Sequence, residues 1–255
     1  MRPALPALLL ASLLVTTGCL GGVFGPSRPP SDERALDAVD RGLTAAGDVA
    51  SYRFSVDGRV EATGDSDTRT IDLSGGGVAN VTRQRLNATT RARGAARSSY
   101  VDGYTAYTEC TRIGWVRENL TRSTPWIDHS PLGQQLALLN RSNVYWRGTR
   151  TLDGTEAAVV TAWPTQQELR SVADARGTGG PDLDGGNVEN VTVTASIGIE
   201  TGRLLRTRTE IRVARGGATA TATLTLRFTG YDEPVEVERP SFDEDALWET
   251  SCPGA

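Results

Sequence analysis

The stretch of sequence that decides the fold is VENVTVTASIGIETGRLLRTRTEIRVARGGATATATLTLRFTGY, residues 188–231. Apolar and polar side chains alternate along it, and a period of two is typical of a strand with one apolar face. Thr201-Gly202 and Gly216-Gly217 interrupt the alternation, and both dipeptides favour tight hairpin turns. We therefore predict three long antiparallel strands, over Val188–Glu200, Arg203–Ala214 and Thr219–Tyr231.

Segments upstream alternate in the same way and are bounded by Gly, Asp, Asn and Ser, which favour turns. They are Ser51–Ala62, Thr68–Leu73, Val78–Thr90, Ser98–Thr108, Gly114–Leu120, Tyr145–Leu152 and Thr155–Ala162. Long antiparallel strands rarely bury both faces. About nine to eleven strands therefore predict one extended sheet with a wet face and a face that wraps around helices or a ligand.

Three segments have the period of a helix instead. The first, Ser31–Ala46, begins where Ser31 or Asp32 would cap it. Its expected apolar face consists of Leu36, Val39, Leu43 and Ala46. The other two are Pro131–Leu139 and Thr165–Ala175, and a loop rich in Gly, Pro and Asp follows over residues 176–187. The sequence thus predicts an α+β, β-rich fold in which a few helices cover a large curved antiparallel sheet.

The first nineteen residues, MRPALPALLLASLLVTTGC, indicate export. Arg2 supplies a positive charge, residues 8–15 form an apolar run, and a small residue precedes Cys19. The run is too short to span roughly 30 Å of hydrocarbon as a helix. We interpret residues 1–18 as a lipoprotein signal peptide and Cys19 as the lipidation site that anchors the chain to the extracytoplasmic face of the cell membrane. An ordinary signal peptide with an incidental cysteine is the alternative.

The tract after this cysteine, residues 19–32, is rich in Gly, Pro and Ser and predicts a flexible tether. No linker divides the remainder, so we interpret residues 33–255 as a single β-rich domain. The 27 basic and 31 acidic residues give a net charge of −4. That balance suggests no basic face, so we expect no nucleic acid among the partners.

Two further cysteines, Cys110 and Cys252, are expected to pair in an oxidising compartment once Cys19 carries lipid. Two free thiols are the alternative. Five Asn-X-Ser/Thr sequons are candidate glycosylation sites in an exported chain. They are Asn80, Asn87, Asn119, Asn140 and Asn190.

The sequence offers no convincing catalytic constellation. His129 is the only histidine, and it lies between Asp128 and Ser130. Because adjacent residues point in different directions whereas a catalytic triad assembles in space, we interpret His129 as a loop residue. The segment Asp182–Gly186 lacks the remaining ligands of a calcium loop. We therefore expect no enzyme activity, no metal ion and no cofactor.

The order of elements resembles the LolA/LppX-type superfamily of lipoprotein carriers and its haloarchaeal lipoprotein relatives. The residues that carry the resemblance are Cys19, Ser51–Phe54 with the helix before them, Tyr100–Tyr107, Pro131–Leu139, Trp163-Pro164 and Phe228–Tyr231. The resemblance implies a half-open β-barrel closed by helices, with an apolar cavity that shelters acyl chains. For this chain it implies the binding or carriage of a lipid or another hydrophobic ligand.

Aromatic residues recur once or twice per strand, and an apolar, aromatic pocket would suit such a ligand. The candidate lining residues are Tyr52, Phe54, Tyr104, Trp115, Trp146 and Phe228. An ordinary closed core is the alternative interpretation. Our hypothesis is therefore a membrane-anchored binder of a hydrophobic molecule. The competing hypotheses are a cell-surface structural or interaction lipoprotein with a filled core and no ligand, and a surface hydrolase that depends on His129.

Overall fold

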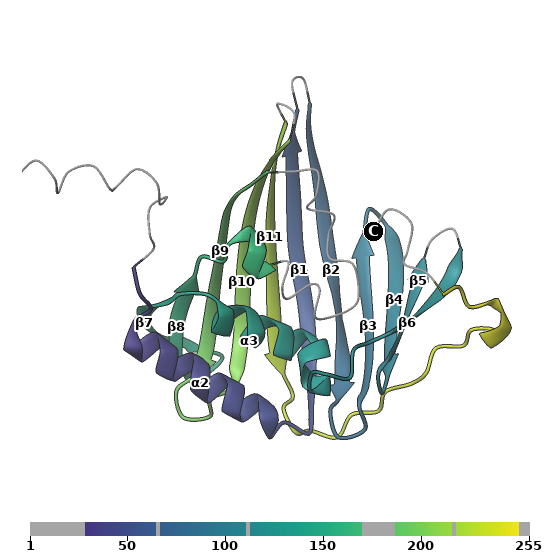
Figure 1. Cartoon of the computed structure of the whole chain (residues 1–255), viewed down its shortest axis with the longest axis horizontal. Helices are drawn as coiled ribbons and strands as arrows, with labels where there is room; N and C mark the ends of the chain where they lie inside the picture. The colour runs from purple at the N-terminus through teal and green to yellow at the C-terminus, as the bar shows by residue number, and fades with distance from the viewer. Residues whose placement is uncertain (1–28, 65–66, 111–112, 170–186, 216–217, 250–255) are drawn as a thin grey trace, which may run out of the picture. The chain divides into compact units, whose positions relative to one another are not determined.

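Eleven antiparallel strands form one curved sheet in the computed structural model, which describes residues 29–64, 67–110, 113–169, 187–215 and 218–249 (Figure 1). The strands are β1 (Ser51–Thr63), β2 (Thr68–Asn80), β3 (Arg85–Ala92), β4 (Ala95–Asp102), β5 (Thr105–Cys110), β6 (Gly114–Asn119), β7 (Val144–Leu152), β8 (Thr155–Ala162), β9 (Asn187–Gly198), β10 (Leu204–Arg215) and β11 (Ala218–Thr229). Their order is β6-β5-β4-β3-β2-β1-β11-β10-β9-β8-β7, so β6 and β7 form the two edges and the sheet stays unclosed. The predicted β-rich class with one large curved antiparallel sheet is confirmed.

The predicted strand Val78–Thr90 is wrong, because it spans a turn between β2 and β3. The Asn80 side-chain oxygen accepts a hydrogen bond from the backbone N–H of Arg83 at 2.9 Å, which closes the turn. Gln84 then has a φ of 55°, a left-handed conformation that no strand continues through. A period-two pattern that runs on through the turn does not reveal it.

The predicted strand Ser98–Thr108 is likewise a hairpin, divided between β4 and β5 at Gly103, whose φ is 59°. The expected turn at Thr201-Gly202 is confirmed, with Gly202 at a φ of 67° and the Gly198 N–H donating to the Arg203 carbonyl. Gly216-Gly217 lies outside the described residues. Glycine adopts positive φ without a steric penalty, so Gly202 correctly indicated the turn between β9 and β10.

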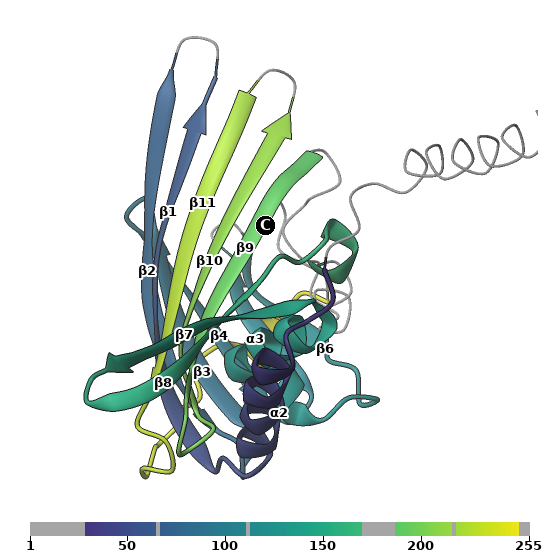
Figure 2. The same ribbon diagram turned by 90° about the vertical axis from the view of Figure 1, so that its left-hand side faces the viewer.

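Two helices cover the concave side of the sheet, which we call the inner face (Figure 2). They are α2 (Glu33–Gly47) and α3 (Pro131–Arg141), which pack against each other, and the 3₁₀ helix η1 (Trp126–His129) leads into α3. A second 3₁₀ helix, η2 (Glu244–Ala246), belongs to the C-terminal tail. The helices cover the lower end of the inner face and leave the long strands extending beyond them (Figures 1 and 2).

The buried face of α2 differs from the predicted one. Leu36 is exposed, whereas the buried positions are Ala35, Ala38, Val39, Gly42 and Ala46. A Cβ added at Gly42 would lie 2.9 Å from Cδ2 of Leu136 on α3. Small residues therefore form the packed face because α2 and α3 approach closely, which the apolar pattern alone does not indicate.

Side-chain capping of α2, expected from Ser31 or Asp32, is also wrong. Asp32 occupies the N-cap position, but its carboxylate accepts a hydrogen bond from the backbone N–H of Trp146 at 2.8 Å. The Ser31 hydroxyl oxygen accepts from the Val144 N–H at 3.0 Å. Both polar side chains thus satisfy the unpaired edge of β7, a position that would otherwise attract another strand.

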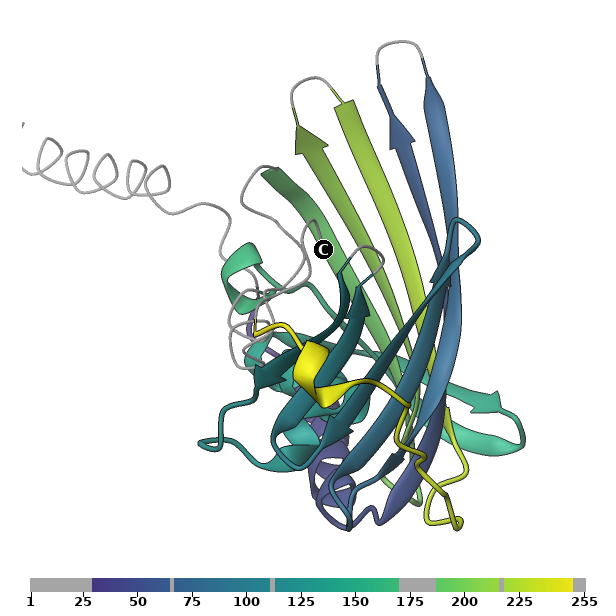
Figure 3. The same ribbon diagram turned by 90° about the vertical axis from the view of Figure 1, so that its right-hand side faces the viewer.

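The opposite edge, β6, is covered by the C-terminal tail. Trp248 forms a parallel bridge with Val116, donating its N–H to the Trp115 carbonyl and accepting from the Arg117 N–H. Before it reaches this edge, the tail crosses the outer face, where the Phe242 ring stacks on Tyr107 at 4.8 Å between centroids (Figure 3). Segments from near the two ends of the domain therefore protect the two edges of the open sheet.

The third predicted helix begins at Gln166 and leaves the described residues after Leu169. The Thr165 hydroxyl accepts from the Glu168 N–H at 3.2 Å, and the Glu168 carboxylate accepts from the Thr165 N–H at 2.6 Å. This reciprocal pair is a capping box, which fixes the start of the helix. Its predicted end and the loop over residues 176–187 lie almost wholly outside the described residues.

Candidate ligand-binding face

The inner face carries apolar side chains that remain half-buried. Six of them lie on four neighbouring strands, β2, β1, β11 and β10. We call these six residues the inner stripe: Val56, Val60, Ile71, Leu73, Ile211 and Leu224. Val56, Ile211 and Leu224 pack against the hydrophobic core, and all six side chains keep some exposed apolar surface.

Strand register places the members of the inner stripe on one face. Val60 pairs with Ile71 on one side and with Ala222 on the other, and Ile211 pairs with the same Ala222. Paired residues in adjacent strands point to the same side of a sheet. Since Tyr52 of β1 contacts α3 and lies an even number of positions from Val60, the stripe faces the same way as the helices.

A glycine lets two leucines of the inner stripe come together. Gly58 lies directly between Leu73 of β2 and Leu224 of β11 in the register. A Cβ at this position would lie 3.0 Å from Leu224 Cδ1 and 3.4 Å from Leu73 Cβ. The two leucines therefore occupy the space that a side chain at Gly58 would need, and they close the middle of the stripe.

The opposite face of the same strands is polar. Along β1, the residues that alternate with the stripe include Asp57, Arg59 and Glu61, all exposed. Arg59 Nε donates to the Asp72 carboxylate on β2 at 2.9 Å, between two side chains that are more than half exposed. The contrast between the two faces shows that water contacts the outer face and that the inner face is built for apolar contact.

An aromatic cluster closes the lower end of the inner face. The Tyr52 ring lies 6.2 Å from that of Phe54, 6.0 Å from that of Phe228 and 6.2 Å from that of Tyr231, between centroids. The Tyr52 hydroxyl accepts a hydrogen bond from the Leu132 N–H at the start of α3. Burial raises the pKa of the Tyr52 phenol well above its usual value. The cluster is part of the hydrophobic core and forms the floor below the inner stripe.

Three of the six predicted lining residues are brought together and three are not. Tyr52, Phe54 and Phe228 pack together, but they are buried in the floor. Tyr104, after the β4–β5 turn, packs edge-on against the His129 ring, and Trp146 of β7 lies under the Arg34 guanidinium at 4.7 Å. Trp115 lies on the outer face, where its ring contacts Phe242. Sequence reasoning chose aromatic residues and overlooked the aliphatic inner stripe, although the alternation that predicted the strands also indicated it.

His129 is buried, and neighbouring protein groups hold its ring. Its Nε2 lies 2.8 Å from the Thr121 carbonyl oxygen and 3.1 Å from the Thr124 hydroxyl, while its Nδ1 is buried without a partner among the described residues. Its sequence neighbour Ser130 caps α3 by accepting from the Gly133 N–H. Desolvation raises the pKa of the neighbouring Asp128 carboxyl.

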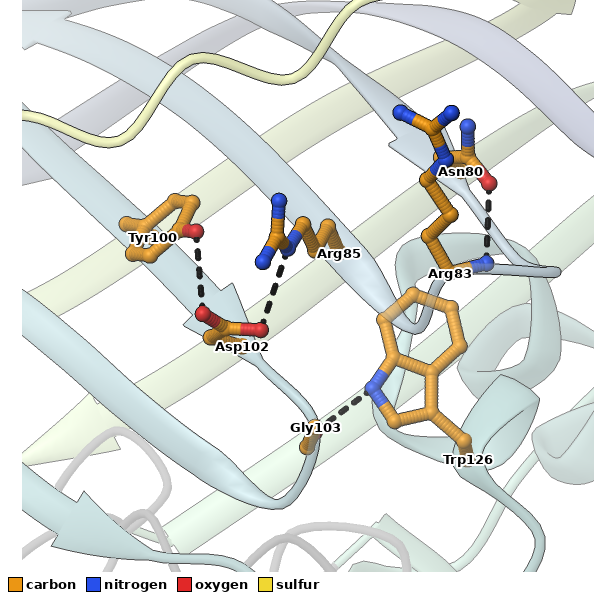
Figure 4. A network of polar contacts seen from close by, with 7 residues as sticks. All are labelled: Asn80, Arg83, Arg85, Tyr100, Asp102, Gly103 and Trp126. Atoms are coloured by element: carbon orange, nitrogen blue, oxygen red, sulfur yellow. Dashed lines mark hydrogen bonds and ion pairs between the residues drawn. The ribbon is translucent and has the colours of Figure 1, made fainter.

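A polar network near the lower end joins the turns to η1 (Figure 4). The Asp102 carboxylate accepts from Arg85 Nε at 3.1 Å and from the Tyr100 hydroxyl at 3.3 Å. One residue further on, the Gly103 carbonyl accepts from the Trp126 indole N–H at 2.7 Å. These contacts hold the β4–β5 hairpin against the element that precedes α3, so they position the floor and its helices.

An acidic side chain lies on the inner face at the edge strand β6. Glu118 of β6 pairs with Ala106 of β5 and is half-buried, and desolvation raises the pKa of its carboxyl. Among the described residues, no group of three or more His, Cys, Asp or Glu side chains is arranged to hold a metal ion. The apolar inner stripe therefore remains the feature around which we build a function.

The predicted modification sites lie in varied positions. Cys110, at the end of β5, is buried and disulfide-bonded. Cys252 and Cys19 lie outside the described residues, so the pairing of Cys110 with Cys252 and the lipidation of Cys19 stay predictions. Of the sequons, Asn119, Asn140 and Asn190 are exposed, whereas Asn80 and Asn87 are half-buried. Asn87 also donates its side-chain amide to the Glu238 carbonyl of the tail at 3.0 Å.

The predicted signal peptide also lies outside the described residues, as does Asp182–Gly186. Within the part of the chain that is described, each helix is too short or too polar to cross a bilayer.

No protein-family model and no curated protein sequence matches the chain. Solved structures with a similar fold include the lipoprotein LppX of Mycobacterium tuberculosis, 16% identical with a TM-score of 0.47 over 82% of this chain and 100% of that one. The lipoprotein LprF of Mycobacterium bovis is 15% identical, with a TM-score of 0.45 over 84% and 100%. A LolA superfamily protein of Nitrosomonas europaea is 7% identical, with a TM-score of 0.26 over 76% and 91%.

Proposed function

We propose that this protein is a membrane-anchored extracytoplasmic lipoprotein that binds or carries a lipid or another hydrophobic ligand on the inner face of its sheet. The observation that carries the proposal is the inner stripe, in which apolar side chains of four strands stay half-buried beyond the helices. Acyl chains bind by contact with such surfaces, and each side chain that is fully covered contributes about 1.5–3 kcal/mol.

The filled floor supports the same proposal. Because Tyr52 and Phe228 are packed beneath the stripe, a ligand would rest on a preformed surface without displacing core side chains. A preformed site loses little conformational entropy on binding. The sheet is not closed between its edge strands β6 and β7, and this opening would let a long apolar molecule reach the inner face.

The binding proposal is tested on residues 31–255, which form one compact unit, purified without detergent. We expect organic extraction followed by mass spectrometry to recover a stoichiometric hydrophobic molecule. After its removal, a fluorescent fatty acid should bind, and Val60→Gln should weaken this binding about tenfold by placing an amide in the stripe.

The matched control is Glu61→Gln, which introduces the same side chain at the next position of β1, on the outer face. It should bind the fluorescent fatty acid like the unaltered protein. If extracts contain no hydrophobic molecule and Val60→Gln binds the probe unchanged, the ligand proposal is wrong. A cell-surface structural or interaction lipoprotein would then be the better interpretation.

The lipid anchor is a separate part of the proposal and is inferred from the sequence of residues 1–19. We expect intact-mass measurement of the membrane-extracted protein to show a chain that begins at Cys19 and carries a lipid adduct. The Cys19→Ser variant should appear in the aqueous fraction. A full-length chain with an unmodified Cys19 would contradict the anchoring proposal and leave the ligand proposal to its own test.

A further inference from the structure

Three arginines converge on the outer face of the sheet, on the side opposite to the inner stripe. Arg206 and Arg208 lie on β10, and Arg150 lies on β7. Together they line a pocket of about 160 Å³. A pocket of this size has room for a small oxyanion such as phosphate.

Hydroxyl groups complete the wall of this pocket. Thr192, Thr194 and Ser196 of β9 line it, and the strand register sets Ser196 beside Arg206 and Thr194 beside Arg208. Arg150 reaches the pocket across β8, where its pairing partner is the small residue Ala157. Guanidinium and hydroxyl donors therefore point to a common space from three different strands.

The charges in the pocket are not balanced. Glu210 also lines it, but its carboxylate is held by Arg208 at 2.8 Å. The nearby Arg227 of β11 pairs with Asp57 at 3.1 Å. The guanidinium groups of Arg206 and Arg150 form no hydrogen bond or ion pair with any of the described residues.

This crowding of like charge affects Arg206 directly. The pKa of its guanidinium is lowered, first by desolvation and then by repulsion from Arg227, Arg150 and Arg208. Arginine in proteins stays protonated nonetheless, so the side chain keeps its positive charge. Arg206 is half-buried, whereas Arg150 and Arg208 are exposed. The repulsion on Arg206 would be relieved by an anion bound beside it.

We propose that this pocket, which we call the outer arginine pocket, binds a phosphate-type oxyanion. Arg206 and Arg150 would supply charge-assisted hydrogen bonds, and the planar guanidinium matches phosphate oxygens in pairs. The hydroxyls of β9 would donate to the remaining oxygens. The oxyanion is either free phosphate or the phosphate of a lipid headgroup, and it is independent of any ligand on the inner face.

The test uses the full-length chain and inorganic phosphate in calorimetric titrations at low ionic strength. We expect binding that Arg206→Gln weakens about tenfold or more, because a charge-assisted contact is lost. Arg150→Gln should also weaken it, and this exposed side chain on another strand keeps the test valid if Arg206→Gln fails to fold. The matched control is Arg212→Gln, on the same strand but paired with Glu189 outside the pocket, which should change the affinity less than about twofold.

A second arm distinguishes a lipid headgroup from free phosphate. Flotation is compared between phosphatidylcholine vesicles and vesicles that also contain phosphatidylglycerol, so that any lipid anchor contributes equally to both. Phosphate binding that depends on Arg206 and Arg150 supports a free oxyanion. Preference for the anionic vesicles that is lost in both variants, without phosphate binding, supports a headgroup. The proposal would be overturned if Arg206→Gln, Arg150→Gln and Arg212→Gln weakened binding equally. It would also be overturned if the protein bound neither phosphate nor the anionic vesicles.

Discussion

The inner face of the sheet has a lower half that is filled and an upper half that is not. In the lower half, α2 packs on strands β7–β9 and on α3, and Leu132, Leu136 and Leu139 of α3 are fully buried. In the upper half, the same alternation of apolar residues continues along β1, β2, β10 and β11, where these strands extend beyond α2 and α3 (Figures 1 and 2). Similar strands therefore do two things: they hold the domain together where they are covered, and they offer apolar surface where they are not.

The difference between the halves teaches that burial here depends on helix placement and not on strand sequence. Val56 of the inner stripe and Phe54 of the floor are adjacent inward-facing residues of β1, yet Phe54 is buried and Val56 is half-buried. Stability should therefore be concentrated in the lower half and ligand binding in the upper half. The following predictions test that separation.

The largest effect is expected from Leu136→Ala in the lower half. Leu136 is 1% exposed and touches the position of Gly42 on α2, so its removal leaves a cavity between the two helices. We expect the free energy of unfolding in urea to fall by about 2–5 kcal/mol. A loss smaller than that caused by Val60→Ala in the upper half would contradict the assignment of the core to the lower half.

An intermediate effect is expected from alkaline pH. Burial raises the pKa of Tyr52 and of Tyr231, whereas an unfolded phenol titrates near pH 10. Below about pH 10 both states are protonated and the stability is fully present. Above it only the unfolded state loses protons, so the free energy of unfolding should fall by up to about 1.4 kcal/mol per pH unit for each of the two groups.

Urea titrations from about pH 8 to about pH 11 measure this slope. The Tyr52→Phe variant should have a shallower slope, since one of the phenols with a raised pKa is gone. The inner stripe contains no titrating group, so Val60→Ala should leave the slope unchanged. A Tyr52→Phe protein with the slope of the unaltered chain would mean that this phenol is not the buried group that resists ionisation.

The smallest effect on stability is expected from Val60→Ala in the upper half. Its side chain is only half-buried, so the free energy of unfolding should change by less than about 1 kcal/mol. Binding of a fluorescent fatty acid should weaken measurably in the same variant. Loss of stability comparable to that of Leu136→Ala would show that the stripe is part of the closed core.

Much of the fold could be predicted from the sequence because the long strands alternate strictly. The segments Val188–Glu200 and Arg203–Ala214 correspond closely to β9 and β10. Prediction failed where a pattern of period two continued through a turn, as at Gln84, because side-chain polarity carries no record of a left-handed backbone. It failed for α2 because small residues pack closely only against a particular partner, here Leu136.

The candidate sites were less predictable. An aromatic residue such as Trp115 was expected to line a cavity, but the register places it on the outer face with Phe242. The outer arginine pocket had no signature at all in the sequence, since Arg150 and Arg206 are far apart along the chain. Only the pairing of β9 with β10 and the small residues of β8 bring their side chains to one place.

The sequence by itself determined the alternation of strand faces and the number of long strands, because side-chain direction in a strand follows from covalent geometry. It also carries the pattern of the leader that precedes Cys19. The tertiary structure alone decided which part of the inner face is covered and which arginines meet on the outer face. The physical reason is that burial and charge density depend on neighbours brought together by strand pairing and helix packing, and these neighbours are remote in sequence.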